Sequence, residues 1–182
     1  MTAAEPWQTA EVSGPQKASV ITKPEVVVAM IMKSKHPILI VGHKAAEIDV
    51  EDKKLIDLIV DFALKTKIPV VATAHVVTEF LKRSYRPAGW MPAVDIGNRL
   101  ADSEWKGIDG KGQHDLALFV GLPYYMELNI LSGLKHFAPH LKTVTLDNVY
   151  HSHASWSFPN ISAKDWHENL KVIIDKSGAG GK

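Results

Sequence analysis

The chain of 182 residues is long enough for one domain with a substantial core. Its apolar fraction of 46%, charged fraction of 23% and net charge of +1 give no sign of a nucleic-acid or membrane-surface binder. Because cysteine is absent, disulfides, cysteine-ligated zinc, cysteine-ligated iron–sulfur clusters and thiol catalysis are excluded within this chain. The longest apolar run, 26–32, is too short to span a bilayer, and no signal-peptide pattern is present, so we expect a cytoplasmic protein.

Residues 1–21 show neither helical nor strand periodicity, and we interpret them as an N-terminal arm. A tryptophan in this arm, Trp7, suggests docking on this domain or on a partner; the alternative is a frayed terminus. Thr22 and Glu25 then form a capping box, which predicts a helix start. The apolar residues 26–32 surround this helix on all sides, so the sequence predicts that it is heavily buried.

Four short runs are predicted as strands, and the first of them is apolar on both faces, as buried parallel strands are. They are residues 38–41, 68–72, 116–120 and 143–146. Helices are predicted between and after them, at 50–65, 76–83, 93–100, 124–137 and from 162 onward, and loops at 84–92, 102–114 and 148–161. This alternation predicts an α/β fold: one three-layer domain over 22–176, with a parallel Rossmann-like sheet, helices on both faces and a flexible tail at 177–182.

Small or polar residues follow each predicted strand, at the edge where open α/β sheets bind nucleotides. They are Gly42 and His43, Thr73 and His75, Gly121, and Asp147. We therefore predict one cofactor-binding crevice lined by these residues, in which the glycines allow close approach of a ligand. The alternative is that the glycines serve only as turns, because a dinucleotide fingerprint needs three glycines in fixed spacing. The glycines of the 102–114 loop precede a strand and are on the wrong side for a nucleotide.

Neither a metal site nor a catalytic centre is predicted. His151 and His153 could share a face of an extended segment, but a metal would need a further ligand, with His167 or Asp147 folding back. No serine elbow or paired nucleophile and base stands out, so we name no catalytic residue. Aromatic side chains outside the predicted strands favour an interface or a planar ligand; they are Trp90, Trp105, Tyr124, Tyr125, Trp156 and Phe158. We expect the arm and the aromatic segment 148–160 to form the contact with a partner.

Several motifs together resemble a known family. The runs Pro37-Ile-Leu-Ile-Val-Gly-His, Ile68-Pro-Val-Val-Ala-Thr-Ala and His114-Asp-Leu-Ala-Leu-Phe-Val-Gly resemble the central domain of thiamine-diphosphate enzymes, which carries FAD or ADP or is vestigial. The arm Glu5-Pro-Trp-Gln-Thr-Ala-Glu and the stretch from Val120-Gly-Leu-Pro-Tyr-Tyr-Met to Thr145-Leu-Asp-Asn-Val-Tyr-His-Ser-His are more specific. They resemble the epsilon subunits of the archaeal acetyl-CoA decarbonylase/synthase complex, in its carbon monoxide dehydrogenase component. The resemblance covers nearly the whole chain.

The resemblance implies a small accessory subunit with no activity of its own. Such a subunit docks on and stabilises the alpha subunit of carbon monoxide dehydrogenase, in an alpha2-epsilon2 component of a larger multienzyme complex that makes or cleaves acetyl-CoA in methanogens and related archaea. The nickel–iron–sulfur clusters would belong to the partner alone, which fits the absence of cysteine here. FAD is the cofactor that the resemblance suggests for this chain, with a role in electron transfer.

Two alternatives remain from the sequence. The chain could be a stand-alone flavin- or nucleotide-binding module of the same fold. It could also be an NAD-dependent enzyme, such as a deacylase or a deoxyhypusine-synthase-like transferase. The deacylases usually carry a four-cysteine zinc ribbon, which is absent, and no lysine has the context of a transferase nucleophile.

Overall fold

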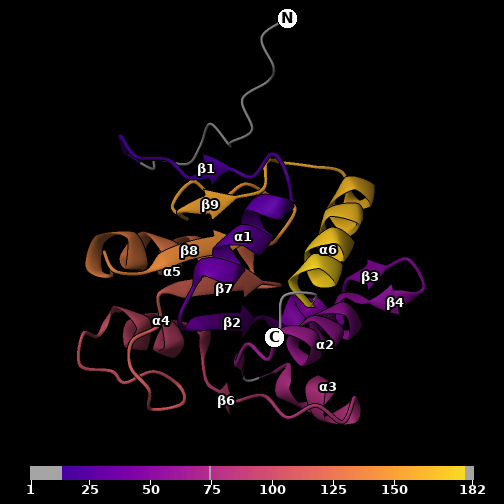
Figure 1. Cartoon of the computed structure of the whole chain (residues 1–182), viewed down its shortest axis with the longest axis horizontal. Helices are drawn as coiled ribbons and strands as arrows, with labels where there is room; N and C mark the ends of the chain where they lie inside the picture. Colours follow the sequence, from indigo (N-terminus) through magenta and orange to yellow (C-terminus); the bar gives the residue numbers. More distant parts are fainter. Residues whose placement is uncertain (1–13, 74, 179–182) are drawn as a thin grey trace, which may run out of the picture.

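The computed structural model describes residues 14–73 and 75–178. In this part of the chain a parallel sheet lies between two layers of helices (Figure 1). The arrangement confirms the predicted α/β class, with a single Rossmann-like domain.

Seven parallel strands form the sheet of the described residues, in the order β1-β9-β8-β7-β2-β5-β6. Their bounds are β1 (Ser19–Val20), β2 (Pro37–Val41), β5 (Val70–Ala72), β6 (Gly89–Trp90), β7 (Leu116–Val120), β8 (Lys142–Thr145) and β9 (Trp156–Ser157). A separate antiparallel pair consists of β3 (Asp49–Val50) and β4 (Lys53–Lys54).

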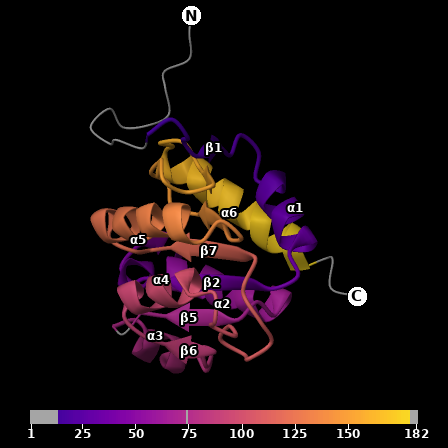
Figure 2. The same cartoon turned by 90° about the vertical axis from the view of Figure 1, so that its left-hand side faces the viewer.

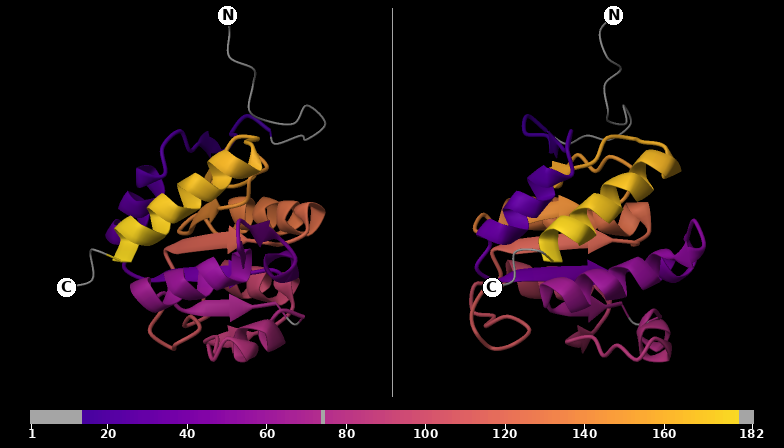
Figure 3. Two further views of the ribbon diagram at one scale, coloured as in Figure 1. Left: turned by 90° about the vertical axis from the view of Figure 1, so that its right-hand side faces the viewer. Right: turned by 45° about the vertical axis from the view of Figure 1, so that its right-hand side comes forward.

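Helices cover both faces of the sheet. They are α1 (Glu25–Lys33), α2 (Leu55–Thr66), α3 (Val77–Lys82), α4 (Ala93–Ala101), α5 (Tyr124–Phe137) and α6 (Ala163–Gly178), with a short 3-10 helix, η1 (His43–Ala46). Figure 3 shows α1, α2 and α6 in front of the strands, and Figure 2 shows α4 and α5 side by side. No helix in the described ranges is both long enough and apolar enough to cross a membrane.

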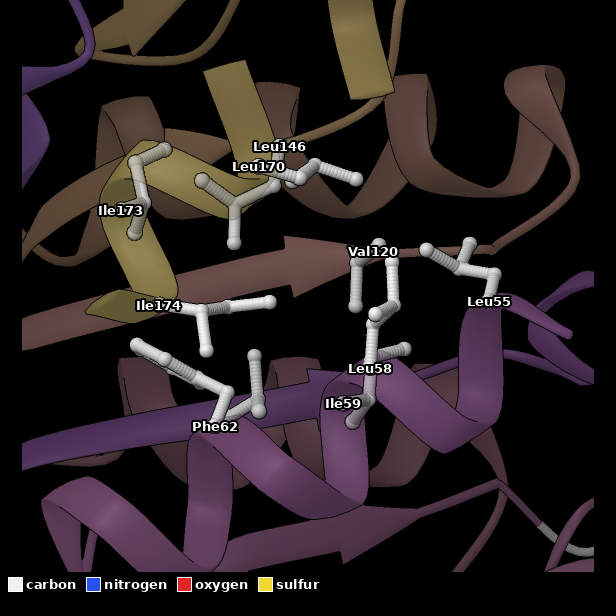
Figure 4. Close-up of a pocket in the computed structure, with 10 residues that line it drawn as sticks. Leu55, Leu58, Ile59, Phe62, Val120, Leu146, Leu170, Ile173 and Ile174 are labelled. Atoms are coloured by element: carbon white, nitrogen blue, oxygen red, sulfur yellow. The ribbon is translucent and has the colours of Figure 1, made fainter. Parts of the chain in front are cut away.

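Side chains along the central strands point alternately to the two faces of the sheet, and this divides the core into two parts. In β2, Leu39 packs into the cluster beneath α1, α2 and α6, whereas Ile38 and Ile40 pack into the cluster beneath α4 and α5. Both clusters are dry and apolar, so the strand is apolar along its whole length, as the sequence predicted. On the first side, Phe62 of α2 and Ile174 of α6 point toward each other over the sheet (Figure 4).

The order of the strands creates a topological switch point between β2 and β7. From β2 the chain moves outward to β5 and β6, and it then returns to β7 and continues outward in the other direction to β8 and β9. In open α/β sheets the crevice for a ligand lies at this point, outside the carboxyl ends of the strands. The residues that follow Val41 and Val120 therefore determine what this edge can bind.

The prediction for α1 needs correction. Its N-cap is Pro24, and no side chain caps the helix, so the predicted capping box from Thr22 does not form. Only Val27 and Ile31 are buried, and Met32 is 53% exposed. The helix lies at the outside of the molecule and contacts α6 along one side, so Val28 and Met30 are only partly buried against the core and Met32 faces outward.

Some predicted boundaries are also wrong. Helix α2 begins at Leu55 instead of residue 50, because the preceding residues form the β3–β4 hairpin, in which Glu51 has a left-handed φ of 54°. The short strands β6 and β9 lie in segments that the sequence assigned to loops.

The two ends of the domain differ from the sequence prediction as well. Strand β1 belongs to the sheet, although it falls within the predicted arm of residues 1–21. Residues 1–13, with Trp7, lie outside the described residues. At the other end, α6 continues to Gly178 and Ser177 is buried, so the first residues of the predicted tail are helical.

Candidate functional site

Two glycines meet at the switch point. The Gly42 amide donates to the Val120 carbonyl at 2.9 Å, and the Lys44 amide donates to the Gly121 carbonyl at 3.0 Å. A Cβ atom added to Gly42 would lie only 2.1 Å from the Gly121 carbonyl oxygen. Both glycines are therefore needed for close contact between the two turns, and the backbone itself fills the space between them.

Asp147 completes this closed region from the end of β8. Both of its carboxylate oxygens accept the Gly121 amide, at 3.0 and 3.1 Å. Gly121 has a φ of 71°, which favours glycine and turns this amide toward Asp147. The backbone donor that could have met a phosphate is therefore bonded to a carboxylate of the chain itself.

The other predicted residues lie at the same edge, where Thr73 is buried and the two histidines are more open. The Thr73 amide donates to the Val41 carbonyl at 2.9 Å, which joins the end of β5 to that of β2. His75 is exposed just before α3, and His43 is half-buried at the start of η1. The predicted crevice thus consists of a closed half, formed by Gly42, Gly121 and Asp147, and an open half.

A hollow of about 370 Å³ lies beside the open half. Its lining residues are Val77, Leu81, Arg86, Pro87 and Trp90. Trp90 ends the edge strand β6, pairs in register with Ala72 and is 57% exposed. The hollow therefore offers an aromatic face and a guanidinium group at the edge of the sheet, although neither Thr73 nor His75 lines it.

A cluster of polar side chains lies beneath the closed half. Glu127 from the first turn of α5, Asp147 from the end of β8 and His151 from the following loop each offer a ligand atom, and these atoms lie within 4.8 Å of one another. Glu127 and His151 are buried, and Asp147 is half-buried. Neither carboxyl oxygen of Glu127 has a hydrogen-bond partner among the described residues.

Burial controls the protonation of this cluster. It raises the pKa of Glu127 well above its ordinary value, and the charge of Asp147 adds to that effect. Burial likewise raises the pKa of Asp147 to about 6, although the Gly121 amide and Lys44 oppose the shift. Burial lowers the pKa of His151 to about 4, so its imidazole is neutral at physiological pH.

The sequence analysis missed Glu127, although a signal was present. Glu127 lies on the same face of α5 as the buried Leu131 and Leu134, and a carboxylate on an apolar helix face is uncommon. The pairing of His151 and His153, which the sequence left open, does not form, because their segment is a turn and His153 lines a different hollow. Asp147, by contrast, does fold back on His151.

The aromatic residues of segment 148–160 are largely internal. Tyr150 and Phe158 are buried, and the Tyr150 hydroxyl donates to the Ala18 carbonyl at 2.7 Å. Trp156 is half-buried in β9. These side chains join the loop to the core and to β1, so they do not form the free docking surface that the sequence suggested.

Exposed apolar side chains gather instead over α4 and α5. A groove between these helices is lined by Val94, Gly97, Asn98, Ala101, Asn129, Ile130, Gly133, Leu134 and Phe137. Along α5, Asn129, Gly133 and Phe137 follow at intervals of four residues and line this groove. Phe137 is 73% exposed in the groove, and Tyr125 in the first turn of α5 is 79% exposed but lies outside the lining of the groove. We call this surface the α4–α5 groove.

Comparison with known proteins assigns the chain to a family. The family described as CO dehydrogenase beta subunit/acetyl-CoA synthase epsilon subunit matches residues 1–174. The acetyl-CoA decarbonylase/synthase complex subunit epsilon of Methanothermobacter thermautotrophicus is 40% identical over 170 residues, which cover 92% of this chain and 93% of the relative. The subunit epsilon of Methanothrix soehngenii is 34% identical, with 93% and 89% covered, and the subunit epsilon 1 of Archaeoglobus fulgidus is 36% identical, with 84% and 82% covered. The chain therefore belongs to the family of acetyl-CoA decarbonylase/synthase epsilon subunits.

Proposed function

We propose that the chain is a non-catalytic subunit that docks on and stabilises the nickel–iron–sulfur alpha subunit of carbon monoxide dehydrogenase, in a cytoplasmic alpha2-epsilon2 component. The relatives are named as subunits of the acetyl-CoA decarbonylase/synthase complex, which supports a role in assembly. The chain has no cysteine with which to hold an iron–sulfur cluster, so the clusters would belong to the partner.

The observation that carries this proposal is the α4–α5 groove. Phe137 and Tyr125 stand about 18 Å apart along α5, at 1.5 Å per residue, with Gly133 between them. A Cβ atom added to Gly133 would have no neighbour within 4 Å, so the groove is open at this point. A partner that covers the groove and the neighbouring start of α5 would bury both aromatic rings, and each large apolar side chain that is buried contributes about 2 kcal/mol.

Substitution of Phe137 tests this assignment. We expect Phe137→Asp to weaken co-purification with the alpha subunit at least tenfold, because it places a charge in a desolvated contact. The matched control is Met32→Asp on α1, an exposed apolar residue on the opposite face of the sheet, which should bind as the parent does. Equal binding by Phe137→Asp and the parent chain would contradict the assignment of the groove.

The N-terminal arm is tested separately. Removal of residues 1–13 leaves β1 intact and removes Trp7. If the arm adds to the contact, this deletion and Trp7→Ala should both weaken association with the alpha subunit. Unchanged association would restrict the docking surface to the described part of the chain.

A second candidate function is FAD binding at the open half of the predicted crevice. The hollow at the edge strand β6 favours it, because the exposed indole of Trp90 offers a face for stacking and Arg86 offers a cation for the pyrophosphate. Gly42, Gly121 and Asp147 contact one another and leave no room for a ligand between them. Their role in FAD binding would therefore be to support the turn next to the flavin. A flavin held here would exchange electrons with the clusters of the partner.

A flavin titration tests this candidate. We expect saturable, micromolar quenching of FAD fluorescence that is lost in Trp90→Ala and kept in Tyr125→Ala, a control with an exposed aromatic residue elsewhere. In the presence of the alpha subunit, CO should bleach the absorbance of the bound flavin. Absence of binding both with and without the alpha subunit would exclude FAD as a cofactor of this chain.

A further inference from the structure

We propose that Glu127, Asp147 and His151 bind one divalent first-row transition-metal ion at the carboxyl edge of the sheet. The site joins the start of α5, the end of β8 and the loop that follows β8. It does not depend on the docking proposal, because none of its residues lines the α4–α5 groove.

The first argument is geometric. The ligand atoms of the three side chains lie within 4.8 Å of one another, and His151 Nε2 is 3.9 Å from Glu127 Oε2. Around an ion with ligand distances of about 2.1 Å, ligand atoms lie roughly 3 to 4 Å apart. Small rotations of the side chains would therefore bring all three onto one ion.

The second argument is the unmet polarity of Glu127. This side chain is fully buried, and neither of its oxygens forms a hydrogen bond of good geometry with a described residue, although the polar side chains of Thr145, Asp147 and His151 are its neighbours. The buried Nδ1 of His151 also lacks a hydrogen-bond partner among the described residues. A buried polar group without a partner is costly, and such groups in folded proteins often mark a missing ligand. A cation between Glu127, Asp147 and His151 would satisfy the carboxyl oxygens without any change of fold.

The third argument comes from the surroundings of the ligands. The Gly121 amide holds the Asp147 carboxylate, and the Tyr124 ring stacks on the His151 imidazole with a centroid distance of 4.4 Å. Such neighbours orient ligands around a metal. A pocket of about 90 Å³, lined in part by Lys44 and Asn148, opens next to Asp147 and His151 and gives an ion and its waters a path.

The donor set determines the class of ion. Two carboxylates and one neutral imidazole suit Zn²⁺, Mn²⁺, Co²⁺ or Fe²⁺ better than Mg²⁺ or Ca²⁺, which prefer oxygen alone. Lys44 faces the same pocket and carries one positive charge against the two carboxylates. When the cation displaces the protons of the two carboxyl groups, their two negative charges outweigh the single positive charge of Lys44.

Calorimetric titration of the chelator-treated full chain with Zn²⁺ and Co²⁺ tests the proposal. We expect one ion per chain with micromolar or tighter affinity, and an affinity at least tenfold weaker in Glu127→Gln. The matched control Glu168→Gln changes an exposed glutamate on α6 and should bind as the parent does. Absence of saturable binding below millimolar concentration would overturn the proposal.

Two further measurements keep the test decisive. His136 and His140 flank the end of α5 and are exposed, so a double variant to asparagine must retain binding; loss in that variant instead would overturn the proposed site. X-ray absorption of the zinc-loaded parent chain does not depend on the folding of any variant. It should show one imidazole nitrogen among oxygen ligands, and a spectrum with two or more imidazoles would contradict the assignment.

Discussion

At the scale of single residues, the contact between Gly42 and Gly121 determines the shape of the carboxyl edge. The two turns approach so closely that a side chain on Gly42 would collide with the Gly121 carbonyl, at 2.1 Å. Gly42 has an ordinary φ of −87°, so the requirement for glycine at this position is steric and does not come from the backbone angle. The pair explains why the edge is closed here although the strand order places the crevice at this point.

We expect Gly42→Ala to destabilise the fold by about 2 kcal/mol or more, because overpacking against backbone forces β2 and β7 to shift. Chemical denaturation of the parent and variant chains measures the difference. Gly133→Ala is the control: its position in α5 is open, and alanine there should stabilise the helix by roughly 1 kcal/mol. Equal stability of Gly42→Ala and the parent would show that the two turns do not meet in solution.

Asp115 is a second residue with a defined role, at the start of β7. Its carboxylate accepts the Ser34 hydroxyl and the amides of Lys35 and His36, the latter two at 2.9 and 3.0 Å. Burial alone would raise the pKa of Asp115, but these hydrogen bonds outweigh it and hold the pKa below the ordinary value of 3.8. Asp115 therefore fastens the end of α1 to the sheet in its charged form.

A dependence of stability on pH follows for Asp115. Because its pKa is lower in the folded than in the unfolded state, its contribution is complete above about pH 5 and is lost as the pH falls through the folded-state pKa. We expect Asp115→Asn to cost about 1 kcal/mol at pH 7 and progressively less below pH 4, as measured by denaturation at several pH values. A difference between the two chains that does not change with pH would contradict this account.

At the scale of elements, the contact between α2 and α6 holds one helical layer together. Side chains from both helices point toward one another above β7 (Figure 4). They enclose a small apolar space of about 20 Å³. A space of this size without polar partners does not hold an ordered water, so the contact depends on packing alone.

We expect Phe62→Ala to destabilise the fold by about 4 kcal/mol, because it enlarges this space and the surrounding helices can collapse only in part. Leu64→Ala in the same helix is the control, since Leu64 is 63% exposed and its change should stay within about 0.5 kcal/mol. Thermal or urea unfolding of both variants provides the measurement. A small effect of Phe62→Ala would mean that α6 does not rest on α2.

The sequence predicted the long elements and missed the short ones, for a physical reason. Strands such as β2 and β7 and helix α5 are long enough to show a period, and their predicted and observed bounds agree within about one residue. Strands β6 and β9 have two residues each, so they show no period and form only because a neighbouring strand pairs with them. The burial of α1 was overestimated because composition does not tell which layer lies above a helix.

The candidate site was predictable only in part, for a related reason. In open α/β sheets, the residues that follow the strands meet at the carboxyl edge. This rule correctly predicted that Gly42, Gly121 and Asp147 lie close together, since it depends only on the order of the elements. The rule could not predict that the Asp147 carboxylate accepts the hydrogen bond of the Gly121 amide, because this bond depends on the rotamer of one side chain. Glu127 lies 20 residues before Asp147 in the sequence, and only the packing of α5 on the sheet brings the two together.

At the scale of the whole molecule, the two faces of the sheet are covered differently. On one face α1, α2 and α6 lie over the strands, and on the other lie α4 and α5 (Figures 2 and 3), where Val94, Tyr125, Met126 and Phe137 are exposed. Exposed apolar area of this kind often marks a contact with another protein. The central claim is therefore that the alpha subunit covers the α4–α5 groove.

Hydroxyl-radical footprinting of the chain alone and in complex with the alpha subunit tests this claim most directly, since Tyr125, Met126 and Phe137 all react with the radical when exposed. The account predicts strong protection of these three side chains in the complex. Met32, exposed on the opposite face, should keep its reactivity and serves as the internal control. Protection of Met32 with unchanged reactivity on α5 would contradict the account.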